Sequence, residues 1–112
     1  MIAGLRPMTE AQFQRAVIDL AKILGWTTVE DGIGELAGLI YHPALSRWSE
    51  RGWPDLALAR RRDGRFLLAE LKSEKGQLTP RQHQVISLLL ACGLDVRVWR
   101  PSDLDEIAAV LR

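Results

Sequence analysis

Cysteine is nearly absent from this chain of 112 residues, which contains only Cys92. A single cysteine excludes an internal disulfide and a cysteine-rich zinc site. No apolar run reaches about 18 residues, so no helix is expected to span a membrane. The segment before the first predicted helix is too short for a signal peptide, and neither internal repeats nor low-complexity stretches occur. These absences predict a protein of the reducing cytoplasm with no membrane partner.

The composition that remains is that of one ordinary folded domain covering residues 1–112. Hydrophobic residues make up 47% of the chain and charged residues 26%, as in globular proteins generally. The net charge of +1 is unevenly spread, because residues 43–100 hold eleven basic and six acidic side chains, whereas both flanks are acidic. A basic central segment predicts contact with a polyanion such as DNA. The alternative is a solvated surface that is rich in arginine.

Hydrophobic spacing and turn residues predict an α/β protein. Two helices each begin with the capping-box pattern T-x-x-Q and end at a glycine, and a third begins at a proline; they cover residues 9–25, 79–93 and 101–111. Strands are expected at residues 26–29, 39–42, 55–60, 65–72 and 94–99. The third and fourth of these form a hairpin around Asp63-Gly64. The order predicts a small mixed sheet flanked by helices, with a long, hard-to-interpret stretch over residues 30–54.

Three charged side chains stand out in the predicted hairpin. Asp55 begins one strand, and Glu70 and Lys72 end the other. Residues two apart in a strand share a face, so Glu70 and Lys72 point the same way, and hairpin pairing brings Asp55 near them. Two carboxylates and an ammonium at one end of a sheet are suited to Mg²⁺ chemistry on a phosphate. The alternative is an ordinary solvated ion pair beside a Pro-Asp strand entry.

Two further polar residues have both a functional and a structural interpretation. Glu10 lies at the edge of the buried side of the first helix, where a carboxylate needs a partner; alternatively, it is a first-turn acid favoured by the helix dipole. Gln82 either closes the capping box with Thr79 or reaches the same site. The sequence slightly favours the capping role.

Five short motifs, in this order, resemble the VRR-NUC domain, a branch of the PD-(D/E)xK nuclease superfamily. The motifs are Glu10, G-W-P-D (52–55), E-L-K (70–72), G-Q-L-T-P-R-Q (76–82) and V-W-R-P (98–101). The resemblance spans nearly the whole chain and is specific in the combination of motifs, although each is weak alone. It implies a restriction-endonuclease-like αβββαβ core of the stand-alone phage or bacterial type, placed in a bacterial or phage-infected cell.

The resemblance also implies residue roles. Asp55 and Glu70 would bind Mg²⁺ or Mn²⁺ together with the backbone carbonyl of Leu71, and Lys72 would act on the attacking water. Glu10 would lie in the outer part of the metal site and Gln82 beside it. Stand-alone domains of this kind resemble Holliday-junction resolvases, so the chain is expected to be a homodimeric endonuclease acting on branched or duplex DNA.

Candidate DNA contacts surround this group. His42, Arg47 and Arg51 precede Asp55 and could contact phosphates, although His42 could equally be structural. Lys75 and Arg81 flank a helix N-terminus, which favours phosphate.

Several other residues have two possible roles or belong to the core. The arginines of the hairpin turn (60, 61, 62 and 65) either grip distal duplex or, as the sequence favours, solubilise the turn. Trp48 and Trp53 either brace their loop or stack on unpaired bases, whereas Trp26 and Trp99 are expected in the core.

Two other functions compete with a nuclease. One is a DNA-binding module of the same fold that does not cut, which the intact Asp55, Glu70 and Lys72 disfavour. The other is a structural domain of a phage or mobile element. For the expected dimer, two apolar surfaces are available: residues 36–41 and the last helix. The first is preferred, because the last helix is needed to cover the sheet.

Overall fold

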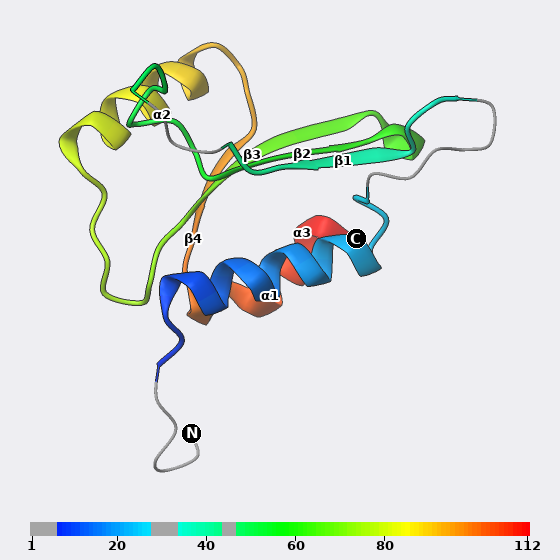
Figure 1. The fold of residues 1–112 in the computed structure, drawn as a ribbon, viewed down its shortest axis with the longest axis horizontal. Coiled ribbons are helices and arrows are strands. Elements are labelled where there is room, and N and C mark those ends of the chain that lie inside the picture. Colours follow the sequence, from blue (N-terminus) through cyan, green and yellow to red (C-terminus); the bar gives the residue numbers. More distant parts are fainter. Residues whose placement is uncertain (1–6, 28–33, 44–46) are drawn as a thin grey trace.

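The protein is built around one four-stranded sheet, shown in Figure 1. The computed structural model describes residues 7–27, 34–43 and 47–112. Within them the elements are α1 (Glu10–Ile23), β1 (Gly38–Tyr41), β2 (Leu56–Arg60), the short 3-10 helix η1 (Arg61–Asp63), β3 (Arg65–Leu71), α2 (Pro80–Ala91), β4 (Val96–Trp99), the 3-10 helix η2 (Pro101–Asp103) and α3 (Leu104–Leu111). This order confirms the predicted αβββαβ core with a final helix.

The sheet is mixed, as the sequence predicts. Its strands lie in the order β1-β2-β3-β4. The first three are antiparallel neighbours, whereas β4 returns parallel to β3 after the α2 crossover. β3 is therefore an inner strand with partners on both sides, and its C-terminal end adjoins the segment that leads to α2.

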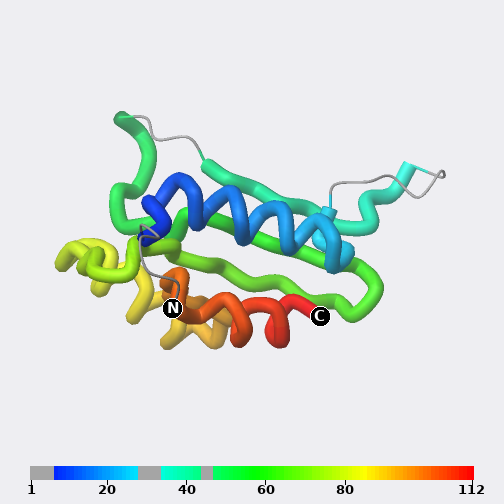
Figure 2. Tube along the Cα trace, turned by 90° about the horizontal axis from the view of Figure 1, so that it is seen from below, coloured from blue at the N-terminus to red at the C-terminus, as the bar shows by residue number. Residues whose placement is uncertain are grey.

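Two helices cover one face of the sheet and one helix covers part of the other. α1 and α3 lie side by side below the sheet in Figure 1, and Figure 2 shows them from that side. They bury a core that includes Phe13, Leu58 and Ile107. On the opposite face, α2 packs Ile86 against Leu68 and Val96. Because α3 is used in this way, its apolar stripe is not free for another partner.

Both predicted capping boxes are present. The Thr9 hydroxyl accepts a hydrogen bond from the Gln12 backbone N–H at 3.1 Å, and the Gln12 side chain accepts one from the Thr9 N–H at 3.0 Å. Thr79 and Gln82 repeat this arrangement at the start of α2. In the described ranges, no helix combines the length and apolar character needed to cross a bilayer.

The hairpin turn is longer than predicted. Arg60 pairs with Arg65, so four residues rather than the expected Asp63-Gly64 pair connect β2 to β3. Arg61–Asp63 form η1, and Gly64 follows with a φ of 63°. Arg60 explains the difference, because its guanidinium bonds both oxygens of Asp63 at 3.1 and 2.6 Å. The expectation that Arg60 is solvated is wrong: it is 3% exposed.

The strand predicted at residues 26–29 is absent at its first two positions, and the others lie outside the described residues. The Trp26 N–H still bonds back to the carbonyl of Ala21 at 2.9 Å, as the chain leaves α1. Its indole N–H donates to the Leu111 carbonyl at 2.7 Å. Trp26 is thus a fully buried core residue, as predicted, but it joins α1 to α3 rather than extending the sheet.

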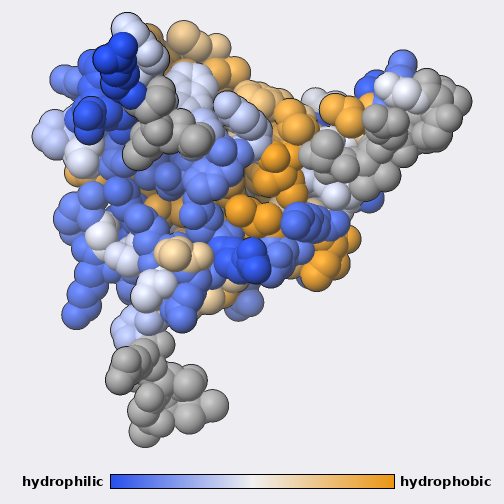
Figure 3. Space-filling view, in the orientation of Figure 1, coloured by the Kyte–Doolittle hydropathy of each residue, from blue (hydrophilic) through white to orange (hydrophobic). Residues whose placement is uncertain are grey.

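The described residues leave one part of the sheet uncovered. Leu39, Ala59 and Phe66 are paired in a row across β1, β2 and β3, on the face that α2 covers only near β4. Leu39 is 40% exposed and Phe66 48% exposed. In Figure 3, hydrophobic atoms gather at the level of β1 along the edge of the sheet. The predicted apolar surface at residues 36–41 therefore coincides with an edge strand.

Candidate functional site

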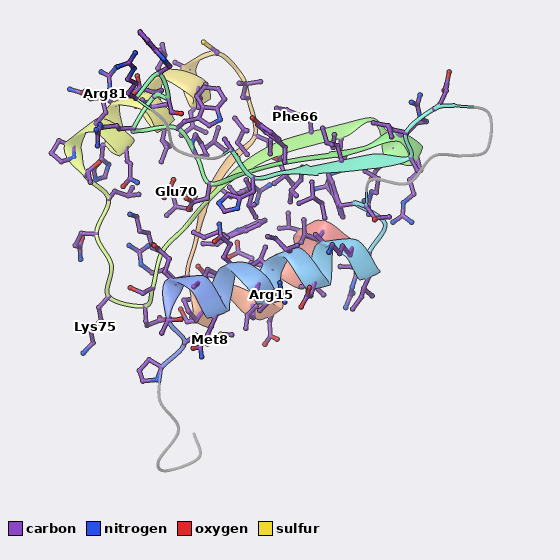
Figure 4. All side chains as sticks on the ribbon, in the orientation of Figure 1. Met8, Arg15, Phe66, Glu70, Lys75 and Arg81 are labelled. Carbon is purple, nitrogen blue, oxygen red and sulfur yellow. The ribbon has the colours of Figure 1, made fainter. Side chains whose placement is uncertain are left out.

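The structure brings Asp55, Glu70 and Lys72 together at one end of the β2–β3 hairpin. Asp55 directly precedes β2, and its Oδ2 accepts a hydrogen bond from the Leu71 backbone N–H at 2.8 Å. Lys72 Nζ lies 3.9 Å from Glu70 Oε1. Figure 4 shows Glu70 in the space between the sheet and α2. The alternation of side chains along β3 therefore places both charges on the α2 face, as the i, i+2 spacing predicts.

Glu70 is the most unusual member of this group. Its side chain is 2% exposed, and among the described residues its Oε2 has no hydrogen-bond partner while the carboxyl is ionised. An ionised oxygen buried in this way costs several kcal/mol unless something compensates its charge. The solvated-ion-pair interpretation does not fit a carboxylate with this burial.

Gln82 fills both of the roles that the sequence left open. Its Oε1 accepts from the Thr79 N–H at 2.9 Å and completes the capping box. Its Nε2 donates to Glu70 Oε1 at 3.2 Å. The start of α2 is therefore attached to the acidic group through one amide side chain, which can hold Glu70 in a fixed orientation.

Glu10, the first residue of α1, is exposed. Its negative charge is one of the influences that raise the pKa of Glu70, so α1 delivers a carboxylate to the neighbourhood of the site. In the described part of the chain, no three His, Cys, Asp or Glu side chains are grouped closely enough to hold a metal ion. Glu10 is thus placed outside the Asp55–Glu70 pair, and its role in an outer part of a metal site stays a prediction.

The electrostatics of the site make a pH-dependent stability expected. The pKa of Glu70 is raised from its ordinary 4.5 to about 8, and burial is the largest cause. The Asp55 charge and a hydrogen bond between protonated Glu70 and Asp55 contribute to this rise, whereas the Lys72 charge opposes it. The folded state thus keeps a proton that the unfolded chain releases near pH 4.5. The free energy of unfolding of the metal-free protein should therefore fall as the pH rises from about 4.5 to about 8.

Urea denaturation in a chelator, across this pH range, measures the effect. Glu70→Gln has no proton to lose, so the variant should show a flatter dependence than the wild-type protein. Equal slopes for the two proteins would contradict the assignment of the effect to Glu70.

The oxygen atoms at this site fit a hard divalent cation. Mg²⁺ and Mn²⁺ favour carboxylate and carbonyl oxygens, and Mg²⁺ keeps several waters, so one or two carboxylates suffice. The unpartnered Glu70 Oε2 is an acceptor that such an ion would satisfy. Asp55, Glu70 and the Leu71 carbonyl are the groups that would hold it, which is the set predicted above.

The predicted DNA contacts are distributed around the site. His42 and Arg51 line a cavity together with Asp55 and Gln82, and His42 also bonds Gln14 at 2.8 Å. The other three candidates are not among the described residues that line this cavity. Arg47 stacks over the Trp48 ring at 4.8 Å, Arg81 forms an ion pair, and Lys75 points away from the sheet in Figure 4.

Sequence reasoning missed the partner of Arg81. Glu50 accepts hydrogen bonds from Arg81 Nε at 2.7 Å and from Nη2 at 2.8 Å. The hydrogen bond to Arg81 lowers the pKa of Glu50 to about 2. The two residues are 31 positions apart, so no local pattern could have revealed the pair. A phosphate would have to compete with Glu50 for the Arg81 guanidinium.

Arg100, the arginine of the V-W-R-P motif, has a supporting role that the motif alone does not reveal. Its guanidinium donates to the Gly76 carbonyl at 2.7 Å. Nearby, the Ser102 N–H donates to Glu74 at 3.0 Å. These bonds fix the segment that connects β3 to α2, and thereby the position from which Gln82 reaches Glu70.

Comparisons with known proteins agree with this arrangement. The model of the VRR-NUC domain family matches residues 10–103. A solved structure described as a VRR_NUC domain protein superimposes with a TM-score of 0.62 at 20% sequence identity, covering 95% of this chain and 87% of the other. No curated protein matches the sequence at a significant level. The family match covers most of the chain and contains every motif residue of the acidic group, and so this protein belongs to the VRR-NUC domain family, a family of nuclease domains.

Proposed function

We propose that this chain is a metal-dependent endonuclease that hydrolyses DNA phosphodiester bonds and prefers branched DNA. The observation that carries the proposal is the buried Glu70 carboxyl group, for whose Oε2 the described residues supply no hydrogen-bond donor when the group is ionised. Asp55 and Lys72 lie beside it. A buried acidic group destabilises the folded state when it is ionised, and such groups are found most often at functional sites. The nuclease family and the basic central segment give independent support.

The side chains have distinct tasks in this proposal. Asp55 and Glu70 hold a divalent cation with the Leu71 carbonyl, and Gln82 keeps Glu70 oriented through its hydrogen bond. The cation, Mg²⁺ or Mn²⁺, would stabilise the negative charge that develops on the scissile phosphate. Lys72, 13% exposed, directs its ammonium group to the same place. It orients the attacking water and offsets the charge of the pentacoordinate phosphate.

A cleavage assay tests the proposal. Duplex, flap and four-way DNA of equal length are incubated with the protein and Mg²⁺ or Mn²⁺, and binding is followed separately by fluorescence anisotropy. Cleavage that needs the cation and is fastest on branched DNA is expected. Binding without cleavage of any substrate would instead identify a non-cutting DNA-binding module.

A second measurement tests the cation site without relying on activity. Mn²⁺ should raise the melting temperature of the wild-type protein, because a ligand that binds only the folded state stabilises it. Glu70→Gln should abolish most of this shift. An undiminished shift in the variant would place the cation elsewhere.

Lys75 is expected to contribute a phosphate contact. It is exposed on the segment between β3 and α2, which Arg100 fixes, and it lies away from α2 in Figure 4. Each phosphate contact releases counterions, so Lys75→Ala should weaken binding and flatten the log–log salt slope by about one. Arg81→Ala should have the smaller effect of the two, since Glu50 already neutralises Arg81. An unchanged slope in Lys75→Ala would move the DNA path toward the arginines of the hairpin turn.

The proposed active form is a homodimer, because a four-way junction presents symmetry-related strands and a two-fold pair of sites matches them. β1 is one of the two outer strands of the sheet; Leu39 in this strand and Leu36 just before it are each 40% exposed. Light scattering at micromolar concentration should give about twice the 12.6 kDa of one chain. Leu39→Asp should lower that mass, whereas Ile23→Asp, at an exposed position of α1, should not. A mass of one chain for the wild type, free and on junction DNA, would refute the dimer.

A further inference from the structure

A cavity of about 450 Å³ opens directly beside the proposed metal site. Asp55 and Gln82 belong to the acidic group and also line this cavity. Its other walls include Tyr41, at the end of β1, and Trp53, which precedes the Pro54-Asp55 entry to β2. Anything bound here therefore touches residues of the site itself.

The cavity is lined by two of the few aromatic residues in the chain. The sequence has four tryptophans, two phenylalanines and one tyrosine. Phe13, Trp26 and Trp99 are buried in the core, whereas Tyr41 is 54% exposed and Trp53 40% exposed. Exposed aromatic faces are surfaces on which bases stack, because every base has a π face. Two such side chains in one cavity beside a proposed phosphodiester site form a stacking surface.

The wall that carries Trp53 is held in place before any ligand arrives. A Cβ at Gly52 would lie 2.6 Å from the Arg81 carbonyl oxygen and 2.7 Å from Val85 Cγ2, so the backbone there packs directly on α2. Glu50 fastens the same segment, because it accepts from Arg81 and, at 3.1 Å, from the Gly52 N–H. The backbone carbonyl of Glu50 also accepts a hydrogen bond from the Trp53 N–H at 3.1 Å. Because this segment is already ordered, a ligand does not lose binding free energy by ordering it.

From this geometry we infer that the cavity receives one unpaired nucleobase of the DNA substrate, from a nucleotide next to the scissile phosphate, with Trp53 as the stacking platform and Tyr41 as the second aromatic wall. The cavity volume of about 450 Å³ is within the range of small-ligand sites. A base inside a duplex cannot reach such a cavity without unstacking, which costs least where it is already single-stranded. The inference rests on the proposed nuclease function and explains how branched DNA would be preferred.

A fluorescence experiment tests the inference. Two DNAs of equal length carry 2-aminopurine at one position, which is unpaired at a fork in the first and paired in the second. Binding is measured with the full chain in EDTA, so that no cleavage occurs. The wild-type protein should bind the fork more tightly and quench its 2-aminopurine. Trp53→Ala should weaken fork binding about tenfold, lose the quenching and leave duplex binding within twofold.

Two further variants make the test specific. Trp53→Phe retains an aromatic face and should restore the quenching. Leu90→Ala removes an apolar side chain of α2 that is 51% exposed and is not among the described residues that line the cavity, and it should behave as wild type.

The outcomes separate this inference from the function on which it rests. Equal losses on fork and duplex, or no loss in Trp53→Ala, would overturn the base pocket while leaving the nuclease intact. A wild-type protein that neither binds nor cleaves any of these DNAs would overturn both.

Discussion

Asp55→Ala, Glu70→Ala and Lys72→Ala are each expected to reduce the rate of DNA cleavage by about 100-fold or more while the fold survives. In the proposed function, Asp55 and Glu70 are the carboxylates that would hold the cation, and Lys72 supplies an ammonium group beside Glu70. No neighbouring side chain in the described ranges completes a three-ligand cluster that could take over. Single-turnover cleavage with protein in excess measures the chemical step directly.

Matched controls come from α1. Asp19→Ala and Lys22→Ala each remove an exposed charge of the same type on that helix and should cleave at the wild-type rate. Circular dichroism melting separates lost chemistry from lost folding. Wild-type turnover in any of the three site variants, with contaminating nuclease excluded, would refute the assignment.

Arg60→Leu is expected to cost about 3–5 kcal/mol of unfolding free energy, because it removes a buried guanidinium and the several hydrogen bonds that it donates. The Arg60 guanidinium makes five hydrogen bonds: two to Asp63 and one each to the carbonyls of Leu24, Leu111 and Arg112. These bonds use every N–H that a guanidinium offers. It also stacks on Trp26 with 4.4 Å to the ring centroid. The substitution takes these donors from Asp63, Leu24 and Arg112, whereas the Leu111 carbonyl keeps the Trp26 indole N–H.

Urea denaturation at neutral pH measures this loss. Arg62→Ala is the matched control, because Arg62 lies in η1 but is exposed, and it should change the unfolding free energy by no more than about 0.5 kcal/mol. A loss below about 1 kcal/mol in Arg60→Leu would show that the network is dispensable.

Local patterns in the sequence were sufficient to predict the helices and the convergence of the acidic group. The capping boxes at Thr9 and Thr79 fix where α1 and α2 begin, since their hydrogen bonds join residues only three apart. Strand alternation and hairpin pairing brought Asp55, Glu70 and Lys72 together for the same reason, because both rules act over short distances.

The features that could not be predicted depend on contacts between distant segments. Arg60 was assigned to a solvated turn because its acceptors at the end of α3 lie about fifty positions away. Glu50 and Arg81 are likewise joined only by tertiary folding. The burial of Glu70 follows from α2 packing over the sheet, and a charged residue at a strand end carries no local signal of it.

The β2–β3 hairpin keeps its stabilising and its costly charges at opposite ends. At one end, every N–H of the Arg60 guanidinium donates a hydrogen bond. At the other end, Asp55 and Glu70 lie close enough for the Asp55 charge to raise the pKa of Glu70. Arg60 lies five positions after Asp55 along the strand, or about 16 Å at the usual rise per residue. Substitutions that are this far apart and share no partners usually have additive effects. If the proposed function holds, directed evolution of this protein for heat resistance can therefore work at the arginine end and avoid the usual trade-off between stability and activity.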